Sequence, residues 1–116
     1  ARGKLAGADY QGSDREKGDG NAASIYGSSD EAAIIAEVSK IADERGVKAV
    51  QIATAWLLQV EGMTAPLIGP TEVGQLEDLI AATEITLSDA EIKRLEAPYE
   101  LKPIMSAVYK TASRLR

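Results

Sequence analysis

A Gly-Pro-Thr corner between an apolar run and an amphipathic stretch is the part of this sequence best suited to hold a ligand. In TAPLIGPTEVGQLEDL, residues 64–79, the corner consists of Gly69, Pro70 and Thr71, and a helical pattern follows. The first turn of a helix exposes backbone N–H groups and a partial positive charge, so it can hold an anion such as phosphate. The Thr71 hydroxyl also suits a simple helix cap. Both roles stay open from the residues alone.

The residue types exclude much of the usual chemistry. The 116 residues include no Cys and no His. Disulfides, thiolate zinc sites and thiol catalysis are therefore excluded. The commonest general base and metal ligand is missing too, which leaves carboxylates, Lys, Tyr and hydroxyls. We assign no catalytic residue and no metal ligand in this chain.

The charge pattern argues against polyanionic partners. The formal net charge is -5, and the basic residues are scattered among acidic ones. This distribution disfavours nucleic acid and anionic membranes as partners. No apolar run approaches the roughly 20 residues that span a bilayer, and the first residues lack the pattern of a signal peptide. We expect a cytoplasmic protein that binds neither nucleic acid nor a membrane.

The first half of the chain predicts a loop and then a helix. Residues 7–29 are rich in Gly, Ser and Asp without a period, which is typical of a mobile loop. Ser29 and Asp30 offer an N-cap for a helix that Gly46 ends. The apolar face of this helix comprises Ile34, Ile35, Val38, Ile41 and Ala42. Its acidic residues Glu31, Asp43 and Glu44 are predicted to lie on the solvated side.

A second helix and a strand follow. Residues 47–62 are apolar almost all round, with Val50, Ala53, Ala55, Trp56, Leu57 and Val60. Such a helix must be covered on several sides, and Trp56 is predicted to anchor a core. Residues 63–69, MTAPLIG, are too short for a helix and predict a buried strand with Leu67 and Ile68 inside, although Pro66 weakens its hydrogen bonding.

Two further helices are predicted after the corner. Residues 72–83 form a helical pattern whose inward positions are Val73, Leu76, Leu79 and Ile80. Ser88 and Glu91 have the spacing of a capping box for a last helix, residues 89–97. Pro98 ends that helix, and residues 98–116 form a tail with apolar residues but no clean period.

The inventory is one strand among helices. One strand cannot make a sheet, and an apolar strand between two helices is typical of a parallel α/β protein. We interpret the sequence as a piece of a longer α/β chain, which taken alone would be mostly α-helical with one strand. The alternative is a stand-alone helical interaction or oligomerisation module, in which the strand would be a loop.

Four segments, in order, carry a family resemblance: ARGKLAG, GVKAVQIATAWLLQ, TAPLIGPTEVGQLEDLIAA and ITLSDAEIKRLEAPY. Together they resemble the C-terminal third of an aldo-keto reductase, and most closely the bacterial subgroup with a PY-containing tail. The resemblance implies a (β/α)8 barrel that reduces aldehydes or ketones with hydride from a nicotinamide cofactor. It makes residues 1–116 the C-terminal portion of one barrel domain: the loop after strand seven, helix seven, strand eight at 65–69, helix eight at 72–83 and a terminal helix.

The resemblance also implies a cofactor site. Residues 1–5 would belong to the segment that wraps the pyrophosphate, the corner would meet the adenosine 2′-phosphate, and the following helix would contact adenine and ribose. The implied cofactor-binding residues are Ala1, Arg2, Gly3, Lys4, Leu5, Gly69, Pro70, Thr71, Gln75, Asp78 and Leu79. NADP is the cofactor that the resemblance implies. Relatives often carry Arg or Lys where this chain has Thr71 and Glu72, and a carboxylate beside a phosphate is repulsive, so NAD stays open.

The catalytic positions of the family all lie upstream of this sequence. Tyr10, Tyr26, Tyr99 and Tyr109 do not stand in the family's catalytic context. We therefore expect the isolated chain to be inactive and the intact protein to act on a small-molecule carbonyl substrate. Because apolar faces would lie uncovered, we also expect the isolated chain to self-associate.

Overall fold

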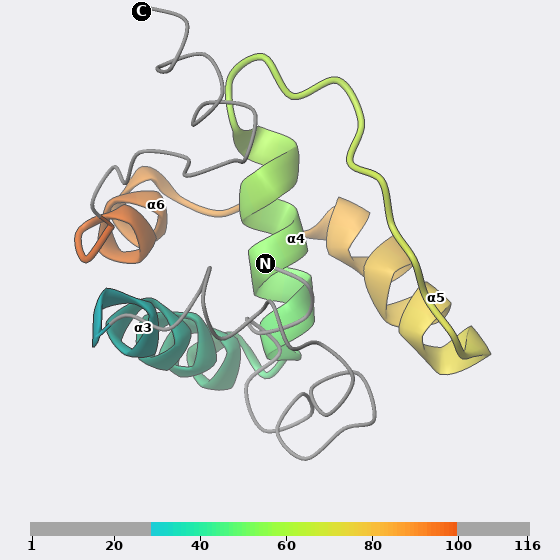
Figure 1. The fold of residues 1–116 in the computed structure, drawn as a ribbon, viewed down its shortest axis with the longest axis horizontal. Helices are drawn as coiled ribbons and strands as arrows, with labels where there is room; N and C mark the ends of the chain where they lie inside the picture. Colours follow the sequence, from blue (N-terminus) through green and yellow to red (C-terminus); the bar gives the residue numbers. More distant parts are fainter. Residues whose placement is uncertain (1–28, 100–116) are drawn as a thin grey trace, which may run out of the picture.

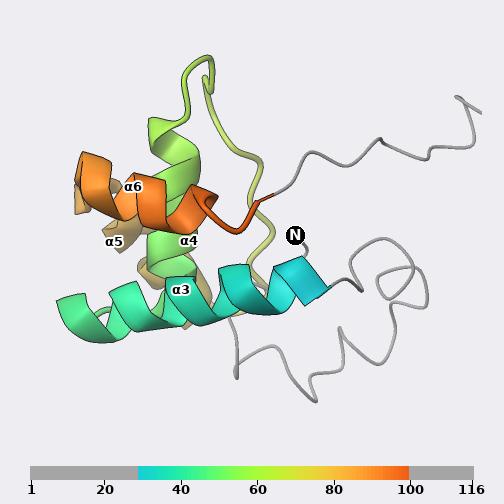
Figure 2. The same cartoon turned by 90° about the vertical axis from the view of Figure 1, so that its left-hand side faces the viewer.

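The computed structural model describes residues 29–99, which form helices arranged around α4 (Figure 1). The elements are α3 (Ser29–Arg45), α4 (Ala49–Gln59), α5 (Val73–Ala81), the 3-10 turn η2 (Ala82–Glu84) and α6 (Asp89–Glu96). Helices α3 and α6 pack side by side on one flank of α4, as Figure 2 shows, and α5 lies on the other flank. Most of the predicted loop and of the predicted tail lies outside the described residues.

Helix α3 ends at Gly46, as the sequence predicted, through hydrogen bonds between neighbouring residues. The N–H of Val47 donates to the carbonyl of Ala42 at 3.0 Å, and that of Gly46 donates to Asp43 at 3.2 Å. These two bonds, with Gly46 at a φ of 66°, make a Schellman motif. Gly46 therefore stops the helix as predicted. The start differs from the prediction, because α3 already includes Ser29 and Asp30, the expected caps.

Helix α6 begins at the predicted capping box. The N–H of Glu91 donates to Ser88 Oγ at 3.3 Å, and the N–H of Ser88 donates to Glu91 Oε2 at 2.7 Å. Each side chain thus satisfies an N–H group that the helix itself leaves unpaired. The prediction of the last helix is confirmed to within one residue at its end.

The core is small and centred on α4. Its buried apolar side chains are Val38, Ile41, Ala42, Ile52, Ala55, Ala82, Leu87 and Leu95. Ile41 of α3 and Ile52 of α4 are the largest fully buried side chains, each with 0% exposure. Trp56 is half-buried against this cluster, and its Nε1 donates to Glu96 Oε1 at 3.0 Å. Trp56 therefore helps to join α4 to α6, as its predicted role required.

The predicted buried strand is wrong for this chain. Residues 63–70 run from α4 towards α5 without forming a strand, and no strand occurs anywhere in residues 29–99. Leu67 is fully exposed, at 105%, and Ile68 is 48% exposed. A strand needs a neighbouring strand to receive its backbone hydrogen bonds, and the described chain offers none. The helix after the corner nevertheless begins within two residues of Thr71, as predicted.

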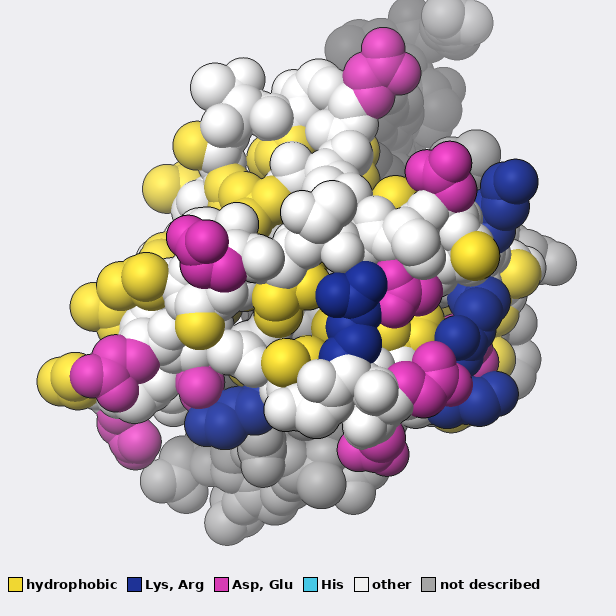
Figure 3. All heavy atoms as spheres, turned by 180° about the vertical axis from the view of Figure 1, so that it is seen from behind, with side chains coloured by type: hydrophobic (Ala, Val, Ile, Leu, Met, Phe, Trp, Pro, Cys, Tyr) yellow, Lys and Arg dark blue, Asp and Glu magenta, His cyan; other side chains and the backbone are white. Residues whose placement is uncertain are grey.

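The predicted inward face of α5 is also largely uncovered. Val73, Leu76 and Ile80 are 73%, 40% and 58% exposed, whereas Leu79 is half-buried. Figure 3 views the molecule from behind and shows hydrophobic side chains gathered at its left edge, over α5 and the segment before it, with acidic side chains between them. We call Leu67, Ile68, Val73, Leu76 and Ile80 the apolar band. The helical spacing of its residues in α5 agrees with the prediction, but no described element covers the apolar band.

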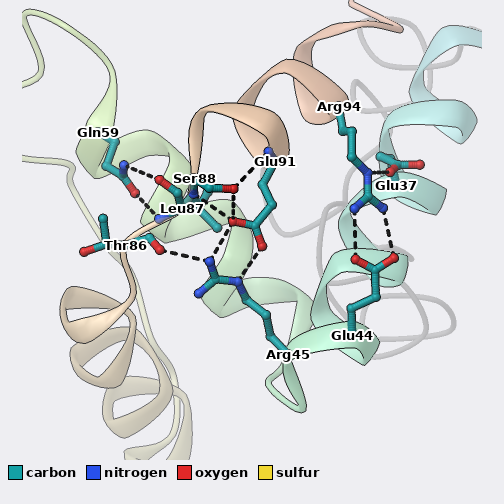
Figure 4. Close-up of polar contacts among 9 residues, drawn as sticks. All are labelled: Glu37, Glu44, Arg45, Gln59, Thr86, Leu87, Ser88, Glu91 and Arg94. Carbon is teal, nitrogen blue, oxygen red and sulfur yellow. Dashed lines mark hydrogen bonds and ion pairs between the residues drawn. The ribbon is translucent and has the colours of Figure 1, made fainter.

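Ion pairs of two arginines, Arg45 and Arg94, join α3 to α6 (Figure 4). Arg45 Nε and Nη2 donate to the two oxygens of Glu91 at 2.6 Å each, and Nη2 also donates to the Thr86 carbonyl at 3.0 Å. Arg94 of α6 donates to Glu37 at 2.6 Å and to Glu44 at 2.9 Å. Glu44, predicted to be only solvated, is therefore an ion-pair partner.

The Arg45–Glu91 pair predicts a defined pH dependence. The hydrogen bonds from Arg45, followed by that from the Ser88 N–H, lower the pKa of Glu91 from 4.5 to about 2. Since the folded pKa is depressed, the pair stabilises the fold above about pH 4.5, and this contribution is lost as the pH falls towards 2. Glu91→Gln should therefore cost about 1 to 2 kcal/mol at pH 7, after allowance for partial exposure, and little at pH 2.

The measurement is urea unfolding of the wild type and Glu91→Gln at pH 7, 4.5 and 2. Glu61→Gln is the matched control, because Glu61 is exposed in the turn after α4. Its effect should be small at every pH. A deficit in Glu91→Gln that stays constant between pH 7 and pH 2 would contradict the assignment.

Candidate functional site

In the corner before α5, the Gln75 side chain binds Thr71, and Thr71 does not cap the helix. Thr71 donates to Gln75 Oε1 twice, from its backbone N–H at 3.0 Å and from its hydroxyl at 3.3 Å. The N-cap residue of α5 is Glu72, in an extended conformation and with no capping hydrogen bond from its side chain. The prediction that Thr71 could cap the helix is therefore wrong by one residue. Its donors point instead to the next turn.

Gln75 and Asp78 lie on one face of α5, and Thr71 in the corner bonds to Gln75. Gln75 and Asp78 are three residues apart within the helix, whereas Thr71 precedes the extended N-cap residue Glu72. The structure thus brings into contact two of the residues predicted to bind a cofactor, Thr71 and Gln75. Gln75 already holds both donors of Thr71, so a ligand at the corner would have to compete with Gln75 for them.

Asp78 is held by the start of α4 through a cycle of three residues. Lys48 Nζ donates to Asp78 Oδ2 at 2.7 Å, and Gln51 Nε2 donates to the Asp78 carbonyl at 3.3 Å. The N–H of Lys48 in turn donates to Gln51 Oε1 at 2.9 Å. The cycle fastens α5 to α4, and this matters because α5 itself buries no residue fully.

The remaining predicted site residues differ in exposure, and some lie outside the described residues. Gly69 is exposed, and a Cβ placed on it would meet nothing within 4 Å. Pro70 and Leu79 are half-buried. Residues 1–5, predicted to wrap a pyrophosphate, lie outside the described residues. The structure therefore describes the predicted site residues between positions 69 and 79, and their role in binding a cofactor stays a prediction.

Lys48 contacts Asp78, one of the predicted site residues, but Lys48 itself was not predicted from the sequence. Its side chain is 59% exposed, and its partner Asp78 lies 30 positions later in the chain. A signal did exist, because residues 49–92 contain no Lys or Arg. Any cation beside α5 had to come from another segment, and local pattern does not reveal which one.

The other acidic residues of α5 are exposed. Glu72 and Glu77 both lie on the surface of the helix, where they give its first half a negative charge.

Within residues 29–99, no group of three or more potential ligand residues could hold a metal ion. None of the described helices is long and apolar enough to cross a membrane.

The chain matches a known family over most of its length. Residues 1–100 match the profile of the Aldo/keto reductase family. This protein belongs to that family. The resemblance stated on sequence grounds is thus confirmed, and the family is one of oxidoreductases with a (β/α)8 barrel fold.

Individual relatives agree with this assignment. The chain is 47% identical over 57 residues to an uncharacterized oxidoreductase of Bacillus subtilis, which covers 49% of this chain and 17% of the relative. It is 37% identical over 70 residues to an aldo-keto reductase of Alternaria alternata, covering 60% and 18% of the two chains. It is also 33% identical over 72 residues to the versiconal hemiacetal acetate reductase of Aspergillus parasiticus, covering 62% and 21%.

These alignments cover about a fifth of the length of each relative. The activity of a whole family member therefore cannot be transferred to residues 1–116 as a fact. No solved structure matches the chain.

Proposed function

We propose that residues 1–116 form the C-terminal portion of a (β/α)8 barrel and supply the phosphate- and adenosine-binding part of a nicotinamide site. The whole protein would reduce an aldehyde or ketone of small size. The observation that carries the proposal is the corner at residues 69–71 leading into α5, with both Thr71 donors bonded to Gln75 in the first turn of that helix. Family membership supports the reaction class.

The residues present fit one end of such a cofactor. The first turn of α5 offers backbone N–H groups, and Thr71 adds a hydroxyl and an N–H beside them. Gly69 leaves open space next to the chain, so a ligand can approach the backbone closely. Glu72 opposes an anion by its charge. The fit is therefore better for a phosphate held by backbone groups than for one held by a side chain at position 72.

Within this proposal each residue has a limited role. Gly69, Pro70 and Thr71 would hold the phosphate on the adenosine ribose, and Gln75, Asp78 and Leu79 would contact adenine and ribose. Residues 1–5 would hold the pyrophosphate. The cofactor, when bound, supplies the hydride. NADP is the cofactor we propose, with NAD as the competing choice that the charge of Glu72 favours.

The proposal predicts nucleotide binding without turnover by this chain. Purified residues 1–116 should reduce no aldehyde with NADPH or NADH above the uncatalysed background, because no catalytic group is assigned in them. Adenosine 2′,5′-bisphosphate should nevertheless shift the amide NMR signals of Gly69, Thr71 and Gln75. Turnover that survives re-purification would contradict the expected absence of catalysis in residues 1–116. Unchanged signals of Gly69, Thr71 and Gln75 at millimolar nucleotide would contradict the proposed nucleotide binding.

A second candidate function is a helical interaction module. The specific observation in its favour is that the segment before α5 is a loop and that the apolar band is exposed. Large contiguous apolar patches are uncommon on monomers and often mark contact surfaces. In this alternative the band would be buried against a second copy, whereas in the barrel it would be covered by other segments of the same domain.

Sedimentation velocity between low and high micromolar concentration tests self-association. We expect the wild type to shift to larger species with concentration and the double variant Leu67→Ser/Val73→Ser to shift less. Leu58→Ser, at a position 37% exposed on α4, is the control outside the band. A monodisperse monomer throughout the range would contradict self-association and remove the alternative.

A further inference from the structure

The side chain of Gln51 in α4 makes two hydrogen bonds with different structural consequences. Its Oε1 accepts the backbone N–H of Lys48 at 2.9 Å, which satisfies a donor at the start of its own helix. Its Nε2 donates to the carbonyl of Asp78 in α5 at 3.3 Å, 27 positions later in the chain. The first bond is local, whereas the second joins two helices.

The Asp78 carbonyl accepts this second bond without losing its place in α5. The N–H of Ala82 also donates to it, as expected in the last turn of a helix. A carbonyl oxygen has two lone pairs, so the Gln51 donor adds to the helical bond and does not replace it. Loss of the Gln51 donor should therefore leave α5 intact and weaken its attachment to α4.

The direction of the first turn of α5 depends on this attachment. The helix buries no residue fully, and Val73 and Leu76 in its first half are exposed. Ala82, directly after its end, is by contrast fully buried. Packing therefore anchors the end of α5 and not its start. Asp78 lies about 4.5 Å along the helix axis from Gln75, so a bond at Asp78 restrains the direction in which the first turn points.

We propose that Gln51 is a positioning residue of the nucleotide site, which fixes the direction of α5 against α4 and so presents the corner at residues 69–71 to the ligand. The inference rests on the proposed function, since it concerns the same site. Gln51 acts through the main chain of α5 and does not touch the nucleotide.

The ion pair between Lys48 and Asp78 supports the same attachment less strictly. Lys48 is 59% exposed, and an exposed ion pair on a flexible side chain is weakened by salt. The Gln51 bond is uncharged and partly buried. It therefore keeps its geometry at an ionic strength that screens the ion pair.

The test separates the two bonds of Gln51 by two substitutions. Gln51→Leu removes both bonds with little change in volume. At pH 7, Gln51→Glu keeps an acceptor for the Lys48 N–H but has no donor for the Asp78 carbonyl. Gln59→Leu is the matched control, because Gln59 lies at the other end of α4 and its carboxamide binds the backbone of Leu87 instead of α5.

Two measurements on the 116-residue chain report on positioning. Residual dipolar couplings of the backbone amides give the direction of α5 relative to α4 without any ligand, and NMR titration with adenosine 2′,5′-bisphosphate gives the affinity. We expect both Gln51 variants to change the α5 couplings and to weaken bisphosphate binding about fivefold, the size expected for one net hydrogen bond. Gln59→Leu should lower the urea midpoint but change neither the couplings of α5 nor the affinity.

Three outcomes would overturn the inference. The first is a set of α5 couplings that is unchanged in Gln51→Leu. The second is a Gln51→Glu variant that behaves like the wild type, because the bond within α4 would then be the important one. The third is an equal loss of affinity in Gln59→Leu, which would reflect lower stability alone. If the wild type binds no bisphosphate, the proposed function itself fails, and the couplings show separately whether Gln51 directs α5.

Discussion

Replacing Ile52 by Ala should abolish or nearly abolish the folded state of this chain. Ile52 lies at the centre of α4 with 0% exposure and packs in the cluster that joins α3, α4 and α6. Truncating a fully buried Ile typically costs about 2 to 5 kcal/mol, as lost transfer free energy plus the cavity left behind. The eight buried apolar side chains among residues 29–99 leave little reserve against such a loss.

Urea unfolding followed by circular dichroism measures the effect at low protein concentration. With a slope of about 1 kcal/mol per molar urea, the midpoint should fall by roughly 2 M or more, or the transition should disappear. Leu58→Ala is the matched control, since it removes an isomeric side chain from the same helix at a position 37% exposed. Its cost should stay below about 1 kcal/mol. Similar midpoints for both variants would show that the core lies elsewhere.

Glu72→Arg should raise the affinity for NADPH relative to NADH by about tenfold or more. Glu72 is the N-cap residue of α5, exposed, and its side chain makes no capping hydrogen bond, so the change leaves the start of the helix intact. It replaces repulsion of a 2′-phosphate by a charge-assisted pair, which is worth about 1.5 to 3 kcal/mol. Exposure and salt can halve this gain. NADH lacks the phosphate, so its affinity should hardly change.

The experiment requires a complete barrel that contains these residues, such as a chimera that joins residues 1–116 to the preceding segments of a relative. Both cofactors are titrated against the parent and Glu72→Arg at one ionic strength. Glu77→Arg makes the same charge change at another exposed position of α5. If both affinities change in parallel, or if Glu77→Arg does the same, residue 72 does not adjoin the 2′-phosphate.

Local signals predicted the helices well. The Ser88–Glu91 capping box and the glycine stop at Gly46 depend on hydrogen bonds between residues at most five positions apart. Residues that near in sequence are also near in space, whatever the rest of the chain does. The same reasoning failed at Thr71, since Glu72 is the N-cap residue of α5 and both Thr71 donors bond to Gln75 instead.

Apolar periodicity predicted which side chains share a face but not whether that face is covered. It identified Val38 and Ile41, which are buried, and equally Val73 and Ile80, which are exposed. The patterns are alike because both faces carry apolar residues at helical spacing. Burial depends on a second element, and the strand predicted at 63–69 likewise depended on a partner strand.

The sequence by itself determined the family, the positions of four helices and the absence of His and Cys chemistry. These properties follow from residue identity and from short-range spacing. Only the tertiary structure decided that Arg45 meets Glu91, 46 positions away, and that Lys48 meets Asp78, 30 positions away. The reason is that charge attraction is not specific to sequence position: many acidic residues could pair with each base, and helix packing selects the one that comes within reach.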